Sequence, residues 1–539
     1  MRPKQLKKRF LAPSRTSNDK SRELLTKRAQ PNVKREIAKT QPQLNGNSLC
    51  GSRPGGASRL EGDRLFLLLT KRQWRGAIAA GTLTAMILWP YYGHISAWVG
   101  AALFIVGVTV VHLRYASRYV IPFPHIALLI AALQYVLAAW ISDSYPSSNA
   151  MFNIGSRLPE YLPFGTLVLL ACAAGWGVGF VGMRVPQRRT VVAARSEFLW
   201  ALDGLLIFGL FNVLICRLIQ GTSFSFLFVL LASLRYVGVL GRMVYHAPGW
   251  AWRLTLVMAA EIVASTNTGG FHELLLWVAW SGALWIYLHT PSWRTILVCG
   301  ATALLLMPSL HAAKWALRDH LWGHTYGLNA KSNSSLGRVS FWLSSLAGNF
   351  RDAAAGNLDA DATGDMIVRY NQGWIVNCVM QHVPNREPYA CGATLKDAFI
   401  ACLLPRVIYS DKAITGGRLN MQKFAGIQLT EETSMNLGYA GEMYANFGYW
   451  GGIIGCGFYC LSLGLLFRAA CIRAFASPMW WAIMPFIFFT GLKAEDDIVG
   501  VLNWSSKACL LLAGMCLAFP PLRQALFLKP SQSRPKLVN

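Results

Sequence analysis

Charged residues are scarce in this chain of 539 residues, and acidic ones are the scarcest. Only 14% of the residues are charged, with 25 Asp and Glu against 51 Lys and Arg. Hydrophobic residues make up 54% and gather in uninterrupted runs long enough to cross a bilayer, which soluble domains do not carry in such number. The composition therefore excludes an ordinary soluble protein and indicates a polytopic membrane protein.

Several motifs of well-known chemistry are also missing. The twelve cysteines include no CxxC pair, so we expect no structural zinc site. The sequence lacks the phosphate-binding motif GxxxxGK(S/T), the GxSxG motif of serine hydrolases and the zinc-binding HExxH motif. The sequence therefore does not look like a primary pump, a lipase or a zinc protease, and we expect neither a bound metal nor a cofactor.

The net charge of +26 is concentrated outside the apolar runs. Residues 1–75 carry 19 Lys and Arg against 5 Asp and Glu, and lack the apolar content to fold alone. Much of the remaining positive charge lies in short connectors between apolar runs, as in the cytoplasmic loops of membrane proteins. We therefore expect attraction to membrane lipid and no nucleic-acid partner.

Apolar runs of spanning length predict an all-α polytopic integral membrane protein with about 12 transmembrane helices. The predicted spans are residues 76–93, 96–113, 121–141, 161–183, 198–216, 224–241, 252–267, 271–289, 294–312, 443–467, 479–492 and 500–519. Basic connectors follow the even-numbered spans, for example RYASRY (114–119) and RVPQRRTVVAARSE (184–197). This pattern predicts that both termini are cytoplasmic.

The spans imply a particular division of the chain. We expect a disordered basic cytoplasmic tail (1–75), a nine-helix membrane region (76–312), one large external loop (313–442), a three-helix membrane region (443–519) and a short cytoplasmic C-terminal tail (520–539). Segments of the loop such as TLKDAFIACLLPRVI (394–408) have apolar residues at helical spacing. They predict short amphipathic helices along the outer membrane face.

Candidate functional residues gather in this loop and at its borders. Arginine fits phosphate oxygens through a planar fork of donors, and the loop arginines are Arg338, Arg351, Arg369, Arg386, Arg406 and Arg418. For any single arginine an ordinary solvated or ion-paired side chain is the commoner case, whereas Arg406, which follows a Pro in an apolar helix pattern, fits either interpretation. His382 is a candidate general base or a structural hydrogen-bond partner. Glu442 stands where the chain re-enters the membrane, where a carboxylate either lines a cavity or ties the structure together.

Two further polar clusters are predicted at the same side of the membrane. TNTGGFHEL (266–274) contains His272 and Glu273, and LKAEDDIVG (492–500) contains one lysine and three acids. Carboxylates with oxygen-rich neighbours can hold a divalent cation, and such strings are also common in plain polar loops. Asp203 and Glu261 are acids inside predicted spans, and Glu261 has no evident role.

Four segments in the second half of the chain occur in a characteristic order: RYNQGWI (369–375), PYACGATL (388–395), LLPR (403–406) with a downstream Asp-Lys pair, and GEMYANFGYWGG (441–452). In this order they resemble the bacterial oligosaccharide repeat-unit polymerases, the O-antigen polymerase group. The resemblance covers residues 200 to 515. It implies a GT-C-like membrane glycosyltransferase with one large external loop late in the chain.

The resemblance also implies an activity and a location. It implies that repeat units on undecaprenyl pyrophosphate are polymerised into a surface or secreted polysaccharide by inverting glycosyl transfer, at the outer face of the bacterial inner membrane. Glu442 and His382 would then be the catalytic candidates, and the substrate-binding candidates would be Arg406, Arg369, Arg386, Tyr444 and Asn446. A chain-length regulator and a flippase of the same pathway would be possible partners. A glycan ligase, another lipid-linked glycosyltransferase and a lipid-linked glycan transporter or flippase remain alternatives.

Overall fold

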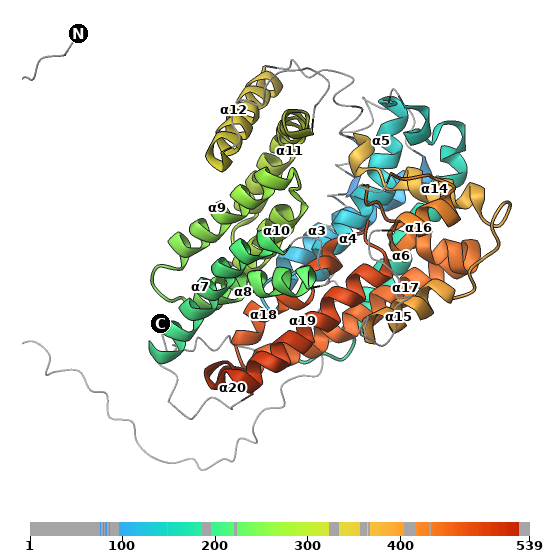
Figure 1. The fold of residues 1–539 in the computed structure, drawn as a ribbon. Coiled ribbons are helices and arrows are strands. Elements are labelled where there is room, and N and C mark those ends of the chain that lie inside the picture. The colour runs from blue at the N-terminus through green and yellow to red at the C-terminus, as the bar shows by residue number, and fades with distance from the viewer. Residues whose placement is uncertain are drawn as a thin grey trace, which may run out of the picture. The chain divides into compact units, whose positions relative to one another are not determined.

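The structure, a computed structural model, describes most of the chain from residue 96 onward. The described residues are 96–147, 149–185, 196–219, 224–322, 334–355, 367–403, 417–430 and 433–527, with the isolated positions 76, 79, 81, 82, 86 and 364. The predicted tail 1–75, Arg406 and all but a few residues of the predicted span 76–93 lie outside this part of the chain. The described residues form helices and connecting segments, without a strand among them (Figure 1).

Eight helical stretches are long and apolar enough to cross a membrane. Seven of them contain the helices α3 (Ala97–Ala116), α4 to α5 (Phe123–Ser144), α6 (Leu158–Gly179), α7 (Ser196–Leu218), α8 (Ser225–Val244), α11 (Trp293–Trp322) and α19 (Ile498–Ala518). The eighth is α17 (Gly438–Ala476). They confirm the prediction of an all-helical polytopic membrane protein, because their length and hydropathy suit a bilayer and little else.

Three other predicted spans have helices that fall outside this group of eight. Residues 252–267 and 271–289 lie in α9 (Trp250–Thr268) and α10 (His272–His289). The predicted span 479–492 is divided between α18 (Met479–Ile487) and the 3-10 helix η6 (Phe489–Leu492). Pro485 inside α18 lacks the N–H that a continuing α-helix needs, which favours so short an element.

Helices α6 and α17 pack together through small residues. A Cβ atom added to Gly175 would lie 2.2 Å from the carbonyl oxygen of Gly457, so only glycine allows the two backbones to approach this closely. Lipid gives helices no hydrophobic reason to associate, and close backbone packing is what replaces it. Gly457, in the part of α17 that follows Glu442, therefore serves helix packing.

Helix α17 is bent near its start. Gly448 has φ 70° and ψ −162°, a conformation essentially reserved for glycine, and it separates the first turns of α17 from the long apolar part. The first turns contain Glu442 and Asn446. The bend sets the direction of this polar stretch independently of the membrane-crossing remainder.

The basic connectors lie together at one end of the helices. Asp203 near the start of α7 pairs with Arg242 at the end of α8 and with Arg253 near the start of α9. Arg468 of α17 donates to the carbonyl of Val181, which follows α6, at 2.6 Å. We call this the connector end, and the end that carries the segment between α11 and α17 the loop end. That the connector end faces the cytoplasm stays a prediction.

The loop end carries further helices, α12 (Ser335–Ala354), α14 (Gly373–His382), α15 (Ala393–Leu403), α16 (Arg418–Asn420) and η5 (Met421–Ala425). Helix α14 buries Trp374, Val376 and Val379, and it packs on the first turns of α17. Helix α15 lies along α19 (Figure 1). The predicted short loop helices thus exist, and α14 and α15 are packed against the membrane helices. The π-helical turn η1 (Leu133–Leu137), between α4 and α5, reaches the same end and carries Gln134 and Tyr135. The short helix α20 (Pro520–Phe527) follows α19 at the connector end.

Candidate functional site

The five residues between η6 and α19 carry four charged side chains at the loop end, and we call residues 493–497 the acidic segment. Tyr135 donates its hydroxyl to the carbonyl of Ala494 at 2.5 Å, which ties the segment to η1. Lys493 and Asp496 form an ion pair of 3.2 Å within the segment. Both of these charged side chains are mostly buried, so the segment is a fixed part of the helix bundle.

Helix α11 brings a row of basic groups to the same place. His311, Lys314 and Arg318 are spaced three and four residues apart, which puts them on one side of the helix. Arg369 belongs to the segment before α14, and its charge acts on all three of these side chains. The loop and α11 therefore contribute positive charge to one location.

His272, the first residue of α10, lies at the centre of this charge. The positive charges of Lys493, Lys314, Arg369 and Arg318 all act on its ring. We call these four basic side chains the basic cluster. They come from three parts of the chain, since Lys314 and Arg318 both belong to α11, so the cluster exists only in the folded protein.

Two members of the basic cluster, Lys314 and Arg369, lack a counter-ion in contact among the described residues. Glu495 is the acid whose charge favours the charged form of Lys314. Like charges gathered beside a bilayer repel one another strongly, and an anionic ligand would relieve that repulsion. The arrangement therefore suits an anion with several oxygen atoms.

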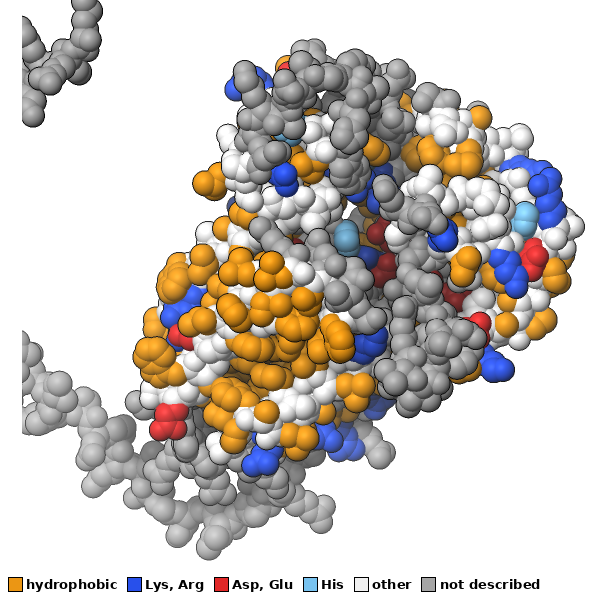
Figure 2. Space-filling view, viewed as in Figure 1, with side chains coloured by type: hydrophobic (Ala, Val, Ile, Leu, Met, Phe, Trp, Pro, Cys, Tyr) orange, Lys and Arg blue, Asp and Glu red, His pale blue; other side chains and the backbone are white. Residues whose placement is uncertain are grey.

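The cluster is open to a ligand. The side chain of His272 is 60% exposed and that of its neighbour Glu273 is 41% exposed, although both belong to a helix among other helices. Figure 2 shows basic, acidic and histidine side chains together in a recess of the surface it displays. Charged groups that are both accessible and surrounded by protein are where binding sites are expected.

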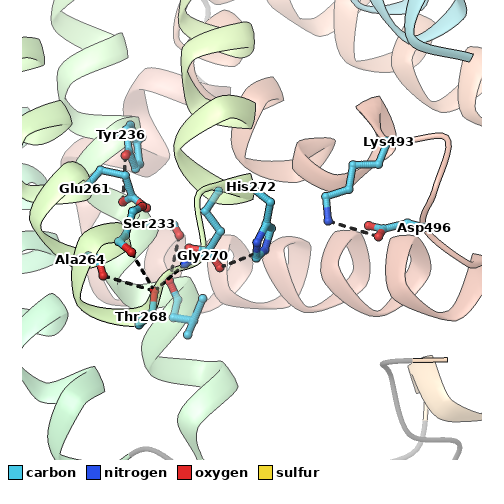
Figure 3. A network of polar contacts seen from close by, with 12 residues as sticks. Ser233, Tyr236, Glu261, Ala264, Thr268, Gly270, His272, Lys493 and Asp496 are labelled. Carbon is cyan, nitrogen blue, oxygen red and sulfur yellow. Dashed lines mark hydrogen bonds and ion pairs between the residues drawn. The ribbon is translucent and has the colours of Figure 1, made fainter. Parts of the chain in front are cut away.

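Glu261, which had no evident role in the sequence, belongs to a buried ion pair. It pairs with Arg235 of α8 and accepts the hydroxyl of Tyr236 at 3.1 Å. The charge of Glu261 also acts on Glu273, which connects the pair to the basic cluster through α10. Figure 3 shows Glu261 and Tyr236 to one side of His272, and Lys493 and Asp496 to the other.

Glu442, the first sequence candidate, has structural partners on both oxygens. Its Oε1 accepts the hydroxyl of Thr394 at 2.8 Å, and its Oε2 accepts the backbone N–H of Ile498 at 2.8 Å. Asn446 donates to Thr394 at 2.7 Å and accepts the N–H of Gly392 at 2.9 Å. Glu442 is 1% exposed. This network joins α15, α17 and the start of α19.

The other sequence candidates do not form one site. Tyr444 is buried against Phe164 of α6, with ring centroids 5.4 Å apart. Arg386 is exposed in the turn after α14. His382 ends α14 and lies against Gly426, where a Cβ would meet its Nδ1 at 2.7 Å. Helix α14, about 15 Å long at 1.5 Å per residue, lies between His382 at its end and Arg369, which precedes its start.

Three residues of the site escaped the sequence-based prediction. Lys314 and Arg318 follow the predicted end of a span at residue 312, so the sequence assigns them to the external loop. The signal that identifies them is the spacing of His311, Lys314 and Arg318, three and then four residues apart, in an otherwise apolar helix. Gln134, whose Nε2 lies 3.5 Å from Oε2 of Glu495, is a lone amide inside a predicted span, and polar groups at such positions usually have a partner or a function.

The two polar clusters predicted around His272 and Lys493 are brought together, as the charge of Lys493 acts on His272. Among the described residues, no three His, Cys, Asp or Glu side chains are placed to hold a metal ion. No protein-family model, curated protein or solved structure matches the chain.

Proposed function

We propose that this chain is a membrane glycosyltransferase that uses an oligosaccharide linked to polyprenyl pyrophosphate as its donor. The observation that carries the proposal is the basic cluster at the loop end of the membrane helices, in which Lys314 and Arg369 form no ion pair with the described residues. A lipid diphosphate has an apolar tail that lies among helices and an anionic group at the membrane surface. Its phosphate oxygens match the donors of Lys314, Arg318 and Arg369.

The charge of the cluster suits the transfer reaction itself. The hydroxyl oxygen of an acceptor sugar attacks the anomeric carbon of the donor sugar with inversion. As that C–O bond forms, the bond from the anomeric carbon to the diphosphate oxygen breaks and its electron pair leaves with the diphosphate. Positive groups fixed in advance around the diphosphate stabilise the negative charge that develops there. Such a reaction needs no nucleotide.

A carboxylate is needed to accept the proton of the acceptor hydroxyl. Glu495 fits this role better than Glu442, because both oxygens of Glu442 are occupied and its side chain is sealed from solvent. Glu495 is partly exposed, and its charge acts on Lys314 of the basic cluster. We therefore assign Glu495 the role of general base and Glu442 a positioning role.

The wider proposal follows the sequence resemblance. The substrate would be a repeat unit on undecaprenyl pyrophosphate and the product a surface or secreted polysaccharide. The chain would cross the bacterial inner membrane about twelve times with a GT-C-like arrangement. The connector end would face the cytoplasm, so that the loop end opens outward. A ligase that transfers finished glycan would use the same diphosphate site, and only its acceptor would differ.

The lipid-linked glycans of a strain without this chain test the proposal. Single repeat units should accumulate and long chains should vanish, and the wild-type gene should restore the long chains. Complementation with Lys314→Gln should fail although the protein is present, and Lys396→Gln, an exposed lysine of α15, should succeed. Accumulation of full-length polymer on the carrier would indicate a ligase. Repeat units trapped on the cytoplasmic leaflet would indicate a flippase and overturn the proposal.

A further inference from the structure

Two glutamines and one glutamate from distant parts of the chain converge beside the basic cluster. The Nε2 atoms of Gln134 and Gln372 both lie 3.5 Å from Oε2 of Glu495. Gln134 belongs to η1, Gln372 immediately precedes α14, and Glu495 lies in the acidic segment. The backbone N–H of Gln372 also donates to the carbonyl of Gln134 at 2.9 Å, which fixes the two glutamines relative to each other.

The remaining oxygen of each glutamine has no partner. Oε1 of Gln134 and Oε1 of Gln372 are buried and accept no hydrogen bond in the structure. Both residues are more than nine-tenths buried, at 8% and 7% exposed. A buried amide oxygen without a donor is destabilising, so two of them at one place indicate that donors arrive from a ligand.

The geometry also shows that the three side chains do not satisfy one another. A separation of 3.5 Å is at the long limit of a hydrogen bond, so the contacts to Glu495 are weak. In both glutamines the side-chain nitrogen, and not the oxygen, faces Glu495. The opposite orientation would place an amide oxygen against the carboxylate, and the two would repel each other. Each glutamine therefore keeps an acceptor, and Glu495 keeps acceptor capacity on both oxygens.

A neutral group with hydroxyl donors fits these free acceptors. A metal cation would meet the positive charges of the neighbouring basic cluster, since Glu495 acts directly on Lys314. Sugar hydroxyls donate to amide and carboxylate oxygens and carry no charge. Amide groups can also accept from the acetamido N–H of an amino sugar.

We propose that Gln134, Gln372 and Glu495 form the subsite for the sugar that is bonded directly to the diphosphate. This inference rests on the proposed function, because it places the sugar next to a diphosphate held by the basic cluster. It extends that function by assigning the recognition of the donor sugar to two glutamines. Diphosphate affinity would then come from the basic cluster, and sugar selectivity from the glutamines.

Binding measurements on the full chain in lipid nanodiscs separate the two contributions. The probes are farnesyl diphosphate and four farnesyl diphosphates bearing glucose, galactose, N-acetylglucosamine or N-acetylgalactosamine. We expect at least one sugar-bearing probe to bind the wild type about tenfold more tightly than farnesyl diphosphate. Gln134→Met and Gln372→Met should each abolish that gain and leave the affinity for farnesyl diphosphate unchanged.

Two controls decide between failure of the subsite and failure of the function. Gln381→Met makes the same change on α14 away from the cluster, and it should keep the gain. Lys314→Gln should weaken all five probes. If no sugar adds affinity, or if the gain survives in both glutamine variants, the subsite inference is wrong. If farnesyl diphosphate does not bind the wild type, or binds Lys314→Gln equally well, the proposed function itself is wrong. Thermal unfolding of each variant identifies any that fails to fold, and the second glutamine variant then supplies the result.

Discussion

Oε2 of Glu442 accepts the backbone N–H of Ile498 at 2.8 Å, so a side chain of one helix caps the first turn of another that lies 56 residues further along the chain. The first N–H groups of a helix have no partner within the helix, and a carboxylate is well suited to them. With Thr394 on its other oxygen, Glu442 joins three elements. Glu442, a catalytic candidate in the sequence, therefore holds α15, α17 and α19 together at the loop end.

Replacing Glu442 with Gln should lower stability. Gln keeps one acceptor oxygen but places an NH₂ group against either the N–H of Ile498 or the hydroxyl of Thr394. We expect the free energy of unfolding to fall by about 1–3 kcal/mol, the cost of a mismatched buried hydrogen bond. Thermal unfolding in detergent measures the change.

The variant Thr394→Val provides the matched test, since it removes the other partner of the same carboxylate. Because the two residues share one hydrogen bond, the effects of the single variants should not add in the double variant. A Glu442→Gln protein of normal stability without activity would contradict the structural role and return Glu442 to catalysis.

Asp497 should make stability depend on pH. Burial, together with the negative charges of Glu442 and Asp496, raises the pKa of Asp497 to about 7, against 3.8 for the free side chain. Between these values the folded chain binds a proton that the unfolded chain has lost. Stability therefore falls as the pH rises from about 4 to about 7.

Asp497→Asn isolates this contribution. Asparagine caps helices as well as aspartate, and it can keep the contact to the N–H of Gly500, which is 3.0 Å in the wild type. Melting temperatures measured between pH 4 and pH 8 should decline less steeply in this variant. Some decline should remain, because burial also raises the pKa of Asp496. Identical slopes for variant and wild type would contradict the assignment.

The membrane-spanning helices were the most predictable part of the fold. Length and hydropathy alone place α3 and α19, because a run of about 20 apolar residues has few other stable arrangements. The ends were less predictable. Helix α11 continues ten residues beyond the apolar run that ends at residue 312, and there Ala313 and Leu317 are buried in a cluster with Phe271 and Trp342. Hydropathy identifies the segments that lie in lipid. It does not identify the helical turns that pack against other parts of the protein.

The candidate site was less predictable than the fold. The sequence indicated that Arg369 and the cluster around Lys493 were candidates, since charge near a membrane is informative by itself. It did not indicate that the charge of Arg369 would act on Lys314 or that Gln134 would contact Gln372. Both interactions join residues far apart in the chain, and no local pattern encodes them. The partners of Glu442 escaped prediction for the same reason.

Asp203 should be essential for stability at the connector end. It accepts hydrogen bonds from Arg242 and Arg253, with the shortest N–O distances at 2.6 and 2.9 Å, and its side chain is only 14% exposed. Asp203→Asn would leave two arginines together without their shared counter-ion. We expect a loss of about 3–5 kcal/mol, the usual cost of breaking a buried ion pair.

The double variant Asp203→Asn with Arg253→Gln controls for that interpretation. Removing one of the two positive charges should restore part of the lost stability, because the repulsion between Arg242 and Arg253 disappears. Chemical unfolding followed by tryptophan fluorescence measures both variants. Additive losses in the double variant would show that repulsion is not the cause.

The bend in α17 should depend on Gly448. Any side chain at this position must adopt a conformation with φ 70° and ψ −162°, and a Cβ there would lie 3.0 Å from the hydroxyl of Tyr389. We expect Gly448→Ala to cost about 1–3 kcal/mol from backbone strain alone. Gly282→Ala is the matched control, because no atom lies within 4 Å of a Cβ at that helical position. It should be neutral or stabilising by about 0.5–1 kcal/mol. Glu442 lies in the first turns of α17, before the bend, so Gly448→Ala should also weaken the hydrogen bond from the N–H of Ile498 to Glu442. The backbone amides in the first turn of α19 should then exchange hydrogen faster. Equal stability of the two alanine variants would show that the bend is not held by Gly448.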